Sequence, residues 1–376
     1  MNIEKSKFQS IIFVGLDVHK NSISLAARSF DKGLIVERAF STKDLNKLRK
    51  FLYKLGAQGV VKCVYEACGA GFFLQREMQA WEIPCEIAAS SLIPRKPGDK
   101  RKNDRLDARM LAEYYQAGLL TMVCVPSAEM EAARGVVRCR QAFRKKVTQI
   151  KHQITKFLQT KGVLYTEGSN WTGQHRDWLS KLQFDCSEDN FTFNMYLSTL
   201  RHLESSLGEL DSKIEHISKR EPFQESVRYL RGFRGVQTLT AMVLVTELGD
   251  VCRFKSPRHL MSYVGLTPSV RESGDSGNKA GSISKAGSAR CRHVLIQAAW
   301  CNVKRPKVGQ ELRLRQAGLP AWVVDDSWRA QERLYRRFKH LEITKGRHKA
   351  IVAVARELIG FLGCTLHKLM SEKPAE

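Results

Sequence analysis

Four carboxylates stand at positions that suit a metal-dependent reaction on phosphate. Asp17 and Glu66 each end an apolar run, IIFVGLDV and VVKCVYE, and strand ends are where the ligands of α/β folds gather. Asp104 and Asp107 lie three residues apart, so a helix would place both on one face. Oxygen ligands of this kind suit Mg²⁺ or Mn²⁺, and two such ions can stabilise the attacking and leaving oxygens of a phosphodiester. Each acid also suits an ordinary strand end or helix cap, so the local pattern leaves both interpretations open.

A serine in a glycine-rich segment is a second candidate for chemistry. Ser273 stands in RESGDSG, close in sequence to Arg271 and followed by small residues that would let a phosphate approach its hydroxyl. The segment contains several other serines, and the sequence shows no Ser-His-Asp pattern. By its local sequence, Ser273 is therefore one of several candidate nucleophiles.

The charge balance points to a polyanionic partner. Among 376 residues, Lys and Arg number 62 against 38 Asp and Glu, which gives a formal net charge of +24 and a pI near 9.8. Nucleic acid is the commonest soluble polyanion that such a surface would bind. Residues 285–349 carry 16 of the basic residues and only 5 acids, so this part is a strong candidate for contacting phosphates.

Composition excludes several other classes of protein. With 43% apolar and 27% charged residues, the chain can bury a sizeable core and is not a disordered polymer. No run of 18 apolar residues occurs and the start does not resemble a secretory signal, so we expect neither a membrane span nor export. The ten Cys, without an export signal, indicate reduced cytosolic thiols. The sequence contains neither a CxxC nor an HExxH motif that would indicate a zinc site.

The elements that would position the acids lie in the first 125 residues. Short apolar runs separated by turns predict strands at 11–18, 22–27, 33–40, 60–66 and 85–89. Helical spacing of apolar residues predicts helices at about 42–55, 72–81 and 103–118, the last preceded by the basic loop PRKPGDKRK. Three strands followed by alternating helices and strands are typical of an α/β fold with a mixed sheet.

Long helices are predicted from about residue 127. Leucine and isoleucine keep strict 3-4 spacing from Leu200 to Ile217, which suits a coiled-coil seam within the chain or between chains. Two amphipathic helices packed on their own domain would give the same pattern. The segment 162–190 is polar, with Gly and Trp, and its sequence predicts no element.

The third region begins near residue 223. YLRGFRGVQTLTAMVLVTELGD resembles a helix-hairpin-helix, whose glycine turn presents backbone N–H groups to a phosphate. The usual turn has two glycines, whereas Gln237 follows Gly235-Val236 here, so the motif is incomplete. Residues 265–287 are rich in Gly, Ser and charge, as linkers and functional loops are.

Four blocks together carry a family resemblance. They are GLDVHK at 15–20, YEACGAG at 65–71, NDRLDARMLAEY at 103–114, and GLTPSVRESG followed by GSISKAG. In this order the blocks resemble the DEDD transposases of bacterial insertion sequences, the bridge-RNA-guided recombinases. The resemblance runs from about residue 10 to beyond residue 300.

The resemblance implies a fold class of α/β plus α in three parts. Residues 1–125 would form a RuvC-like domain of RNase H fold that carries the acidic site. Residues 126–222 would form long helices with a coiled coil. Residues 223–376 would form a mainly α transposase domain with the helix-hairpin-helix-like segment and the serine loop.

The resemblance also implies the chemistry. The family's acidic tetrad falls on Asp17, Glu66, Asp104 and Asp107, which become ligands of Mg²⁺ or Mn²⁺, and its nucleophilic serine falls on Ser273. That serine would form a covalent phosphoserine link to DNA, in a site completed across a subunit boundary of a tetramer, a dimer of dimers. A noncoding RNA from the element would pair with donor and target double-stranded DNA, and the protein would act in the bacterial cytoplasm, at the nucleoid.

Basic residues next to these blocks are the predicted nucleic-acid contacts. His19 beside Asp17 is either a further contact or a plain surface residue. The predicted contacts are Lys20, Arg101, Lys102, Arg105, Arg271, Lys279, Lys285, Arg290 and Arg292.

Three other functions remain to be weighed against a recombinase. A RuvC-like junction nuclease would use metal-activated water, with Ser273 only structural. A non-catalytic scaffold would bind RNA or DNA while its acids merely cap and pair. An actin-like ATPase lobe is the weakest alternative, because the order here is G-x-D and no second phosphate loop is evident.

Overall fold

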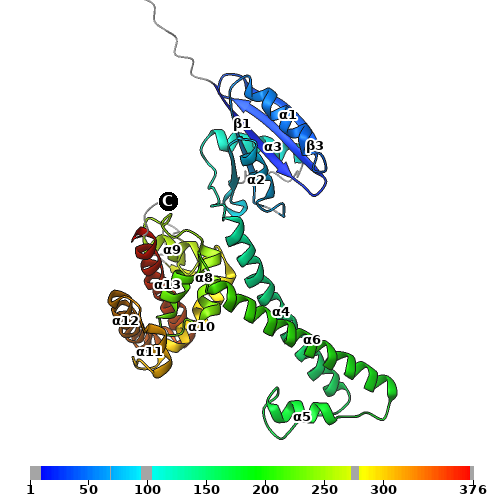
Figure 1. Ribbon diagram of the computed structural model, residues 1–376, viewed down its shortest axis with the longest axis vertical. Helices are drawn as coiled ribbons and strands as arrows, with labels where there is room; N and C mark the ends of the chain where they lie inside the picture. Colours follow the sequence, from blue (N-terminus) through cyan, green and yellow to red (C-terminus); the bar gives the residue numbers. More distant parts are fainter. Residues whose placement is uncertain (1–9, 68, 95–103, 272–278, 373–376) are drawn as a thin grey trace, which may run out of the picture. The chain divides into compact units, whose positions relative to one another are not determined.

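The computed structural model describes residues 10–67, 69–94, 104–271 and 279–372. At the edges of two of these segments, residues 104–105, 270–271 and 279–280, it describes the backbone alone. The chain divides into two compact units, Met1–Val125 and Pro126–Glu376, drawn in blue to cyan and in green to red in Figure 1. The first is mixed α/β and the second is mostly helical, as predicted.

A five-stranded mixed sheet forms the centre of the first unit, in the order β3-β2-β1-β4-β5. β1 is antiparallel to β2 and parallel to β4, β2 is antiparallel to β3, and β4 is parallel to β5. The central strands are buried because their apolar runs face helices on both sides. The strand bounds are Ile11–Val18 (β1), Ser22–Ser29 (β2), Gly33–Ser41 (β3), Val60–Glu66 (β4) and Cys85–Ala88 (β5).

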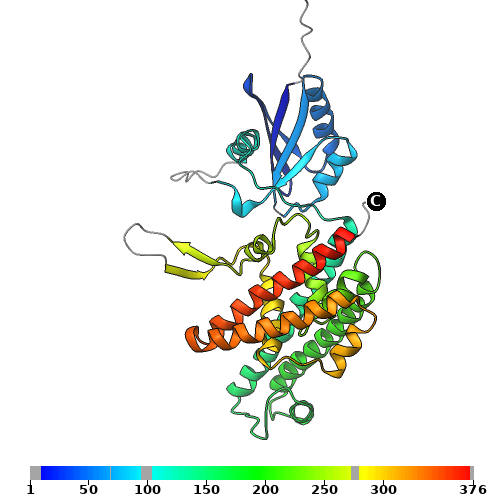
Figure 2. The same ribbon diagram turned by 90° about the vertical axis from the view of Figure 1, so that its left-hand side faces the viewer.

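Helices cover the two faces of this sheet unequally. α1 (Leu45–Gly56) and α2 (Phe73–Ala80) lie on one face, where they enclose the main core together with alternate residues of β1 such as Val14 and Leu16 (Figure 2). α3 (Asp104–Gln116) lies alone on the other face and contacts β1, β2 and β4. The short helix η1 (Ser90–Leu92) follows β5.

α3 packs unusually close to the sheet because the contact is made by small residues. Gly15 of β1 lies against the backbone of Ala108 and Ala112, so that a Cβ on Gly15 would collide with the carbonyl oxygen of Ala108. Ala108 and Ala112 are fully buried. Successive turns of α3 therefore rest directly on the backbone of β1.

Two long antiparallel helices begin the second unit (Figures 1 and 2). α4 (Ala128–Thr160) and α6 (Ser187–Ser218) pack along their length, with Ile154 and Leu158 near Phe193 at one end and Val137 near Ile214 at the other. Part of the heptad stripe is thus buried within one chain. The segment without a sequence assignment contains α5 (Gly173–Lys181).

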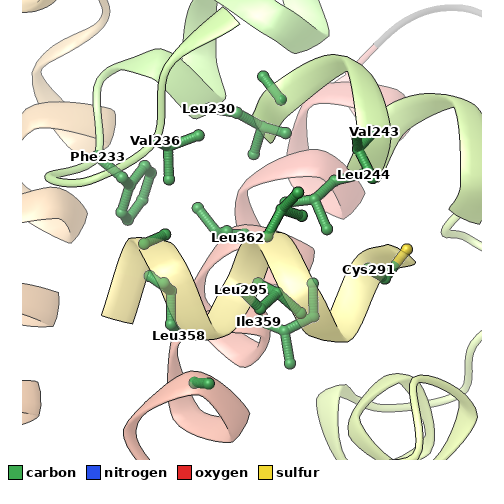
Figure 3. Close-up of a cluster of buried hydrophobic side chains, with 14 of the residues drawn as sticks. Leu230, Phe233, Val236, Val243, Leu244, Cys291, Leu295, Leu358, Ile359 and Leu362 are labelled. Carbon is green, nitrogen blue, oxygen red and sulfur yellow. The ribbon is translucent and has the colours of Figure 1, made fainter. Parts of the chain in front are cut away.

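A second core joins the remaining helices. Figure 3 shows the α7–α8 hairpin, α10 and α13 meeting around residues such as Phe233, Leu295 and Leu362, all nearly fully buried. The elements are α7 (Gln224–Arg231), α8 (Thr238–Leu248), α9 (Pro257–Tyr263), β6 (Pro268–Arg271), β7 (Lys279–Ile283), α10 (Ala289–Trp300), η2 (Cys301–Val303), α11 (Gln310–Gln316), α12 (Ala321–Lys345) and α13 (Arg347–Glu372).

In the part of the chain that the structure describes, α13 alone has the length and composition of a membrane span. The sequence did not predict this, since charged residues interrupt its apolar run. Of the most apolar window of α13, 61% is buried in this unit. α13 packs against α9, α10 and α12, and such burial explains an apolar helix without a membrane.

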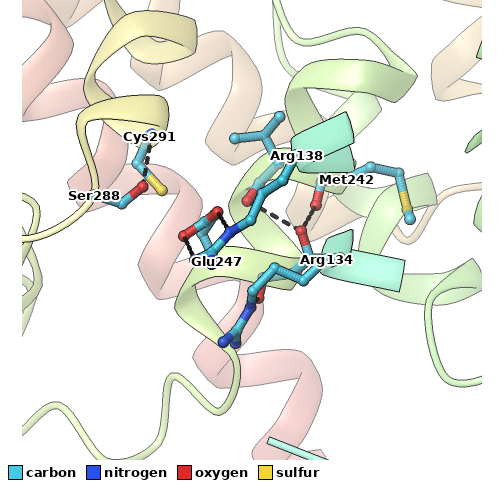
Figure 4. Close-up of polar contacts among 8 residues, drawn as sticks. Arg134, Arg138, Met242, Glu247, Ser288 and Cys291 are labelled. Atoms are coloured by element: carbon cyan, nitrogen blue, oxygen red, sulfur yellow. Dashed lines mark hydrogen bonds and ion pairs between the residues drawn. The ribbon is translucent and has the colours of Figure 1, made fainter. Parts of the chain in front are cut away.

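An ion pair between a buried glutamate and a half-exposed arginine ties α4 to α8 (Figure 4). Arg138 donates to both carboxylate oxygens of Glu247 at 2.7 and 3.0 Å, and Arg134 donates to the carbonyl oxygen of Thr246 at 2.6 Å. The Glu247 side chain is only 5% exposed. Burial by itself would raise the pKa of the Glu247 carboxyl, but the hydrogen bonds and charge of Arg138 outweigh it and hold that pKa below its ordinary value.

Replacing Gly15 by Ala should destabilise the first unit. The new methyl group would push α3 from β1, and overpacking of this kind lowers the free energy of unfolding by about 1–3 kcal/mol. Gly56→Ala is the matched control, because no atom lies within 4 Å of a Cβ at that position. Urea unfolding of the full chain, followed by circular dichroism, measures both; equal effects would contradict the close contact.

Replacing Arg138 by Met should destabilise the second unit in a pH-dependent way. The loss should be roughly 1–3 kcal/mol at pH 7, less than for a fully buried pair, because Arg138 is 45% exposed and solvent screens it. A carboxyl with a lowered folded pKa stabilises above its unfolded pKa and loses that effect as the pH falls. The difference between the wild type and the variant should therefore shrink toward pH 4.

The control for this pair lies on the same helix. Arg140→Met breaks the pair with Asp211, whose side chain is 47% exposed, and should change the free energy of unfolding by less than about 1 kcal/mol. A pH-independent loss in Arg138→Met would show that Glu247 is not the group responsible.

Candidate metal centre and serine loop

Asp17 and Glu66 lie at the same level of neighbouring strands. The parallel register of β1 and β4 pairs Leu16 with Tyr65, so the next residue of each strand is an acid. Side chains alternate along a strand, and Gly15 and Val64, two residues earlier, both face α3. Both acids are therefore placed on the α3 face, at the carboxyl end of the parallel strands.

The direction of α3 brings its first turn to this same edge. Ala108 and Ala112 contact Gly15, and the ring of Tyr115, further along the helix, lies 5.5 Å from that of Phe13, earlier in β1. α3 thus runs antiparallel to β1, and its N-terminus lies at the end of the strand that carries Asp17. Asp104 and Asp107 share the helix face that includes Ala108 and Leu111.

The side chains of this group are described to different degrees. Asp17 is 17% exposed and pairs with His19, whose Nε2 lies 3.0 Å from its Oδ2. Glu66 and Asp107 are partly buried. Asp104 begins α3, but its side chain lies outside the described residues; the strand register places Asp17 beside Glu66, and Asp107 lies in the first turn of α3.

The donor set fits a hard divalent cation. All four predicted ligands offer carboxylate oxygens, which Mg²⁺ and Mn²⁺ prefer. Among the side chains that the structure describes, no three His, Cys, Asp or Glu form a ready-made metal group. A closed site would therefore need Asp104 and a rearrangement of the Asp17–His19 pair.

The serine loop is carried by a hairpin with a tightly held base. β6 and β7 are antiparallel, with Arg271 opposite Lys279, and the connection that contains Ser273 lies outside the described residues. At the base, a Cβ on Gly265 would collide with the backbone of Ala286, so the chain approaches itself closely there. Gly265 has φ +75°, a conformation that favours glycine.

Arg292 fixes this base from α10. Its Nη1 donates to the carbonyl oxygens of Val264 at 2.9 Å, of Gly287 at 3.3 Å, and of Ala286. One nitrogen of the predicted phosphate contact is thus engaged inside the protein. Lys285, in the same loop, is exposed and has a left-handed backbone with φ +56°, a strained conformation for a residue other than glycine.

The remaining predicted nucleic-acid contacts differ in how far they are described. Lys20 and Arg290 are exposed. The backbones of Arg105, Arg271 and Lys279 are described without their side chains. Arg101 and Lys102 lie outside the described residues.

The helix-hairpin-helix segment has the helices predicted for it but an altered turn. α7 and α8 are joined through Gly235, which has φ +84° and lies against the carbonyl oxygen of Ala298. Gln237, in place of the second glycine, is the N-cap residue of α8, and its amide donates to Glu311 at 2.6 Å. The turn is therefore packed against α10 and α11.

A basic groove on α12 lies within the basic segment 285–349, but no residue of this helix was among the predicted contacts. Its arginines recur at helical spacing along one face, beside a groove of about 560 Å³. The carboxylate of Glu357 in α13 forms ion pairs with Arg333 at 2.8 Å and with Arg337 at 3.2 Å, and these pairs fix both guanidinium groups. The 3-4 spacing of arginines in SWRAQERLYRRFKH was the available signal. The basic residues lining the groove are Arg329, Arg333, Arg336, Arg337 and His340.

Two family models match the chain. One, described as "Transposase IS116/IS110/IS902 family", matches residues 227–313. The other, for DEDD transposases of the IS110 type and described as "Transposase", matches residues 14–162. The first model covers the α7–α8 hairpin and the serine loop, and the second covers all four predicted acids.

Curated relatives agree with these matches. A protein of Sinorhizobium fredii named as a transposase, y4qE, is 33% identical over 93% of this chain and 87% of its own. The transposase for insertion sequence element IS1533 of Leptospira borgpetersenii is 32% identical over 88% of this chain and 96% of its own. The pilin gene-inverting protein of Moraxella bovis is 32% identical over 101 residues, 27% of this chain and 31% of its own.

Mn²⁺ should stabilise the chain by binding the acidic group, that is, the carboxylates of Asp17, Glu66, Asp104 and Asp107. A ligand that binds only the folded state at 100 times its Kd adds about 2.7 kcal/mol, so the melting temperature should rise with Mn²⁺ concentration. Asp17→Asn should remove most of this rise. Glu113→Gln is the matched control, because Glu113 lies on α3 and pairs with Arg28 at 3.6 Å. A rise of equal size in all three proteins would place the metal elsewhere.

Proposed function

The chain belongs to the IS116/IS110/IS902 family of transposases and is an enzyme that acts on DNA, and from this premise we propose that it is an RNA-guided recombinase that excises and inserts a mobile element. The observation that carries the proposal is that Asp17 and Glu66 occupy equivalent positions at the ends of neighbouring parallel strands, with the first turn of α3 at the same sheet edge. This is the arrangement expected of a phosphoryl-transfer site with carboxylate ligands.

The proposal divides the chain into three parts. Residues 1–125 would be a RuvC-like domain of RNase H fold, residues 126–222 a helical coiled-coil domain, and residues 223–376 the transposase domain. The order of the five strands and the position of α3 support the first part. The pairing of α4 with α6 supports the second.

Within the first part, Asp17, Glu66, Asp104 and Asp107 would hold the divalent metal that membership of a DEDD transposase family implies, Mg²⁺ or Mn²⁺. When bound, such an ion neutralises charge on a scissile phosphate and stabilises the leaving oxygen. His19 would orient the Asp17 carboxylate, with which it pairs at 3.0 Å.

Ser273 would be the nucleophile. Its hydroxyl loses a proton as the Oγ–phosphorus bond forms, and the bond from phosphorus to a deoxyribose oxygen breaks, with that oxygen taking a proton. The phosphoserine link conserves the energy of the phosphodiester, so a second strand's hydroxyl can attack it and release the serine without ATP. In the proposed tetramer, a dimer of dimers, the serine of one protomer works with the acids of another.

Phosphate contacts would come from basic side chains, and sequence would be read by RNA. A protein whose basic surface meets mainly backbone can leave base reading to a guide, here a noncoding RNA that pairs with donor and target double-stranded DNA. The protein would act in the bacterial cytoplasm, at the nucleoid. The proposed contacts are Lys20, Arg101, Lys102, Arg105, Arg271, Lys279, Lys285, Arg290 and Arg292, together with the basic residues of the α12 groove.

The test uses the gene with its native flanking noncoding DNA on a plasmid. Amplification across the ends of the element should detect excised circular junctions with the wild type and none with Ser273→Ala or Asp107→Asn, a loss of at least about 10³-fold because each removes a group needed for the chemical step. Nucleic-acid binding should stay nearly unchanged, since neither substitution removes a cation. Junctions of normal abundance in Ser273→Ala would refute the serine assignment.

A second readout separates the recombinase from its rivals. A covalent protein–DNA adduct that survives denaturation is expected for the wild type only. Cleavage without an adduct would indicate a junction nuclease that uses water. Binding without cleavage under any divalent ion would indicate a scaffold.

A further inference from the structure

A cavity of about 480 Å³ opens at the carboxyl ends of β1, β3 and β4, next to the acidic group. Three loops converge there: the β1–β2 turn, the β3–α1 connection, and the loop that leads from β4 into α2. Outside the carboxyl ends of parallel strands is where α/β folds bind ligands. The size is within the usual range for a site that encloses a small organic group.

The floor of the cavity is apolar, and its rim carries the polar side chains of His19, Lys20 and Thr42. The floor is the edge of the main core of the first unit, where the core borders the cavity. Its residues are Val18, Ile23, Leu45 and Leu74. The rim residues are His19, Lys20, Thr42, Gly69, Ala70 and Phe73. An apolar bowl with one cation and a few polar groups at its mouth suits a flat, partly polar ring attached to an anion.

The rim is fixed by hydrogen bonds, so the cavity is not an accident of loose loops. Thr42 donates from Oγ1 to the carbonyl oxygen of Lys20 at 2.7 Å, and the backbone N–H of His19 donates to Ser22 at 2.9 Å. Beneath the loop after β4, the fully buried Tyr65 donates from its hydroxyl to the carbonyl oxygen of Gly71 at 2.9 Å.

One residue links the cavity to the candidate metal centre. His19 lines the cavity, and its Nε2 lies 3.0 Å from Oδ2 of Asp17. Asp17 faces α3, whereas the cavity lies on the face of α1 and α2, so the end of β1 separates the two by the width of one strand. A strand of DNA whose phosphate reaches Asp17 would therefore carry a neighbouring base past the mouth of the cavity.

We propose that this cavity receives an unstacked nucleobase of the DNA strand, next to the phosphate that is cut, and that Phe73 provides its stacking surface. Phe73 is 59% exposed, and a base stacked on its ring would cover it. Lys20 at the rim carries the charge that matches the phosphate of the same nucleotide. Enzymes that act on a base take it out of the stack into a pocket in this way, so such a pocket is physically accessible to DNA. The inference rests on the proposed function.

The test scans 2-aminopurine through duplexes that cover the two ends of the element, bound in EDTA to the full-length protein together with the element's noncoding RNA. Fluorescence should rise at one position with the wild type, because the probe brightens when it leaves the stack. Phe73→Ala should weaken binding by about fivefold or more, the loss expected for one stacked base, and should lower the bound-state signal at that position. Ala70→Trp, which fills the mouth, should abolish the rise.

Phe30→Ala is the matched control, because Phe30 is a 73% exposed aromatic ring of the same unit that does not line the cavity. It should leave both the binding and the fluorescence rise unchanged. Phe73→Ala needs no repacking, so it remains informative if Ala70→Trp does not fold. A flat scan, a rise that survives in Phe73→Ala, or equal losses in Phe30→Ala and Phe73→Ala would overturn the proposal.

The scan needs only binding, so its failure differs from failure of the proposed function. Circular junctions with a flat scan would leave the recombinase standing and remove the cavity. A rise at one position with no junctions in any protein would support the base site and count against recombination.

Discussion

The close packing of α3 on β1 is the constraint on which the first unit depends. Gly15 offers no side chain, and Ala108 and Ala112 offer only methyl groups, so the helix rests on the backbone of the strand. A helix held one side chain further out would lift its first turn away from the edge of the sheet. The acids of that turn could join Asp17 and Glu66 in the proposed metal site only because this contact is made by small residues.

The same edge of the sheet serves two faces. Side chains alternate along β1, so Asp17 points to the α3 face while Val18 points to the face of α1 and α2. The acidic group therefore lies on one side of the strand end and the cavity on the other, with His19 between them. The alternation of side chains at the end of β1 would thus place the proposed phosphate chemistry on one face of the sheet and the proposed base site on the other, within a single domain.

In the second unit, arginine side chains fix neighbouring segments by pairing with a buried carboxylate or by donating to backbone carbonyl oxygens. Glu247 is buried against Arg138, and Arg292 donates to several carbonyl oxygens at the base of the β6–β7 hairpin. Buried charges are tolerated when they are paired and hydrogen-bonded, and such pairs fix orientation more than they add stability. In a chain with a net charge of +24, this gives some arginines a structural role and leaves others, such as Arg336 on α12, exposed for a polyanion.

The sequence by itself determined the local elements and the composition of the site. Apolar runs and 3.6-residue periodicity gave the five strands and the helix of Asp104 and Asp107, and the motif blocks identified the family. Only the tertiary structure decided the strand register that places Asp17 next to Glu66 and the contact of His19 with Asp17. It alone also decided the pairing of Arg138 with Glu247, 109 residues away in the sequence. It also decided that Arg292 turns inward and that α5 forms in a segment without a clear pattern. The reason is that periodicity records which face of an element is buried, whereas register and long-range pairing depend on which other element covers that face.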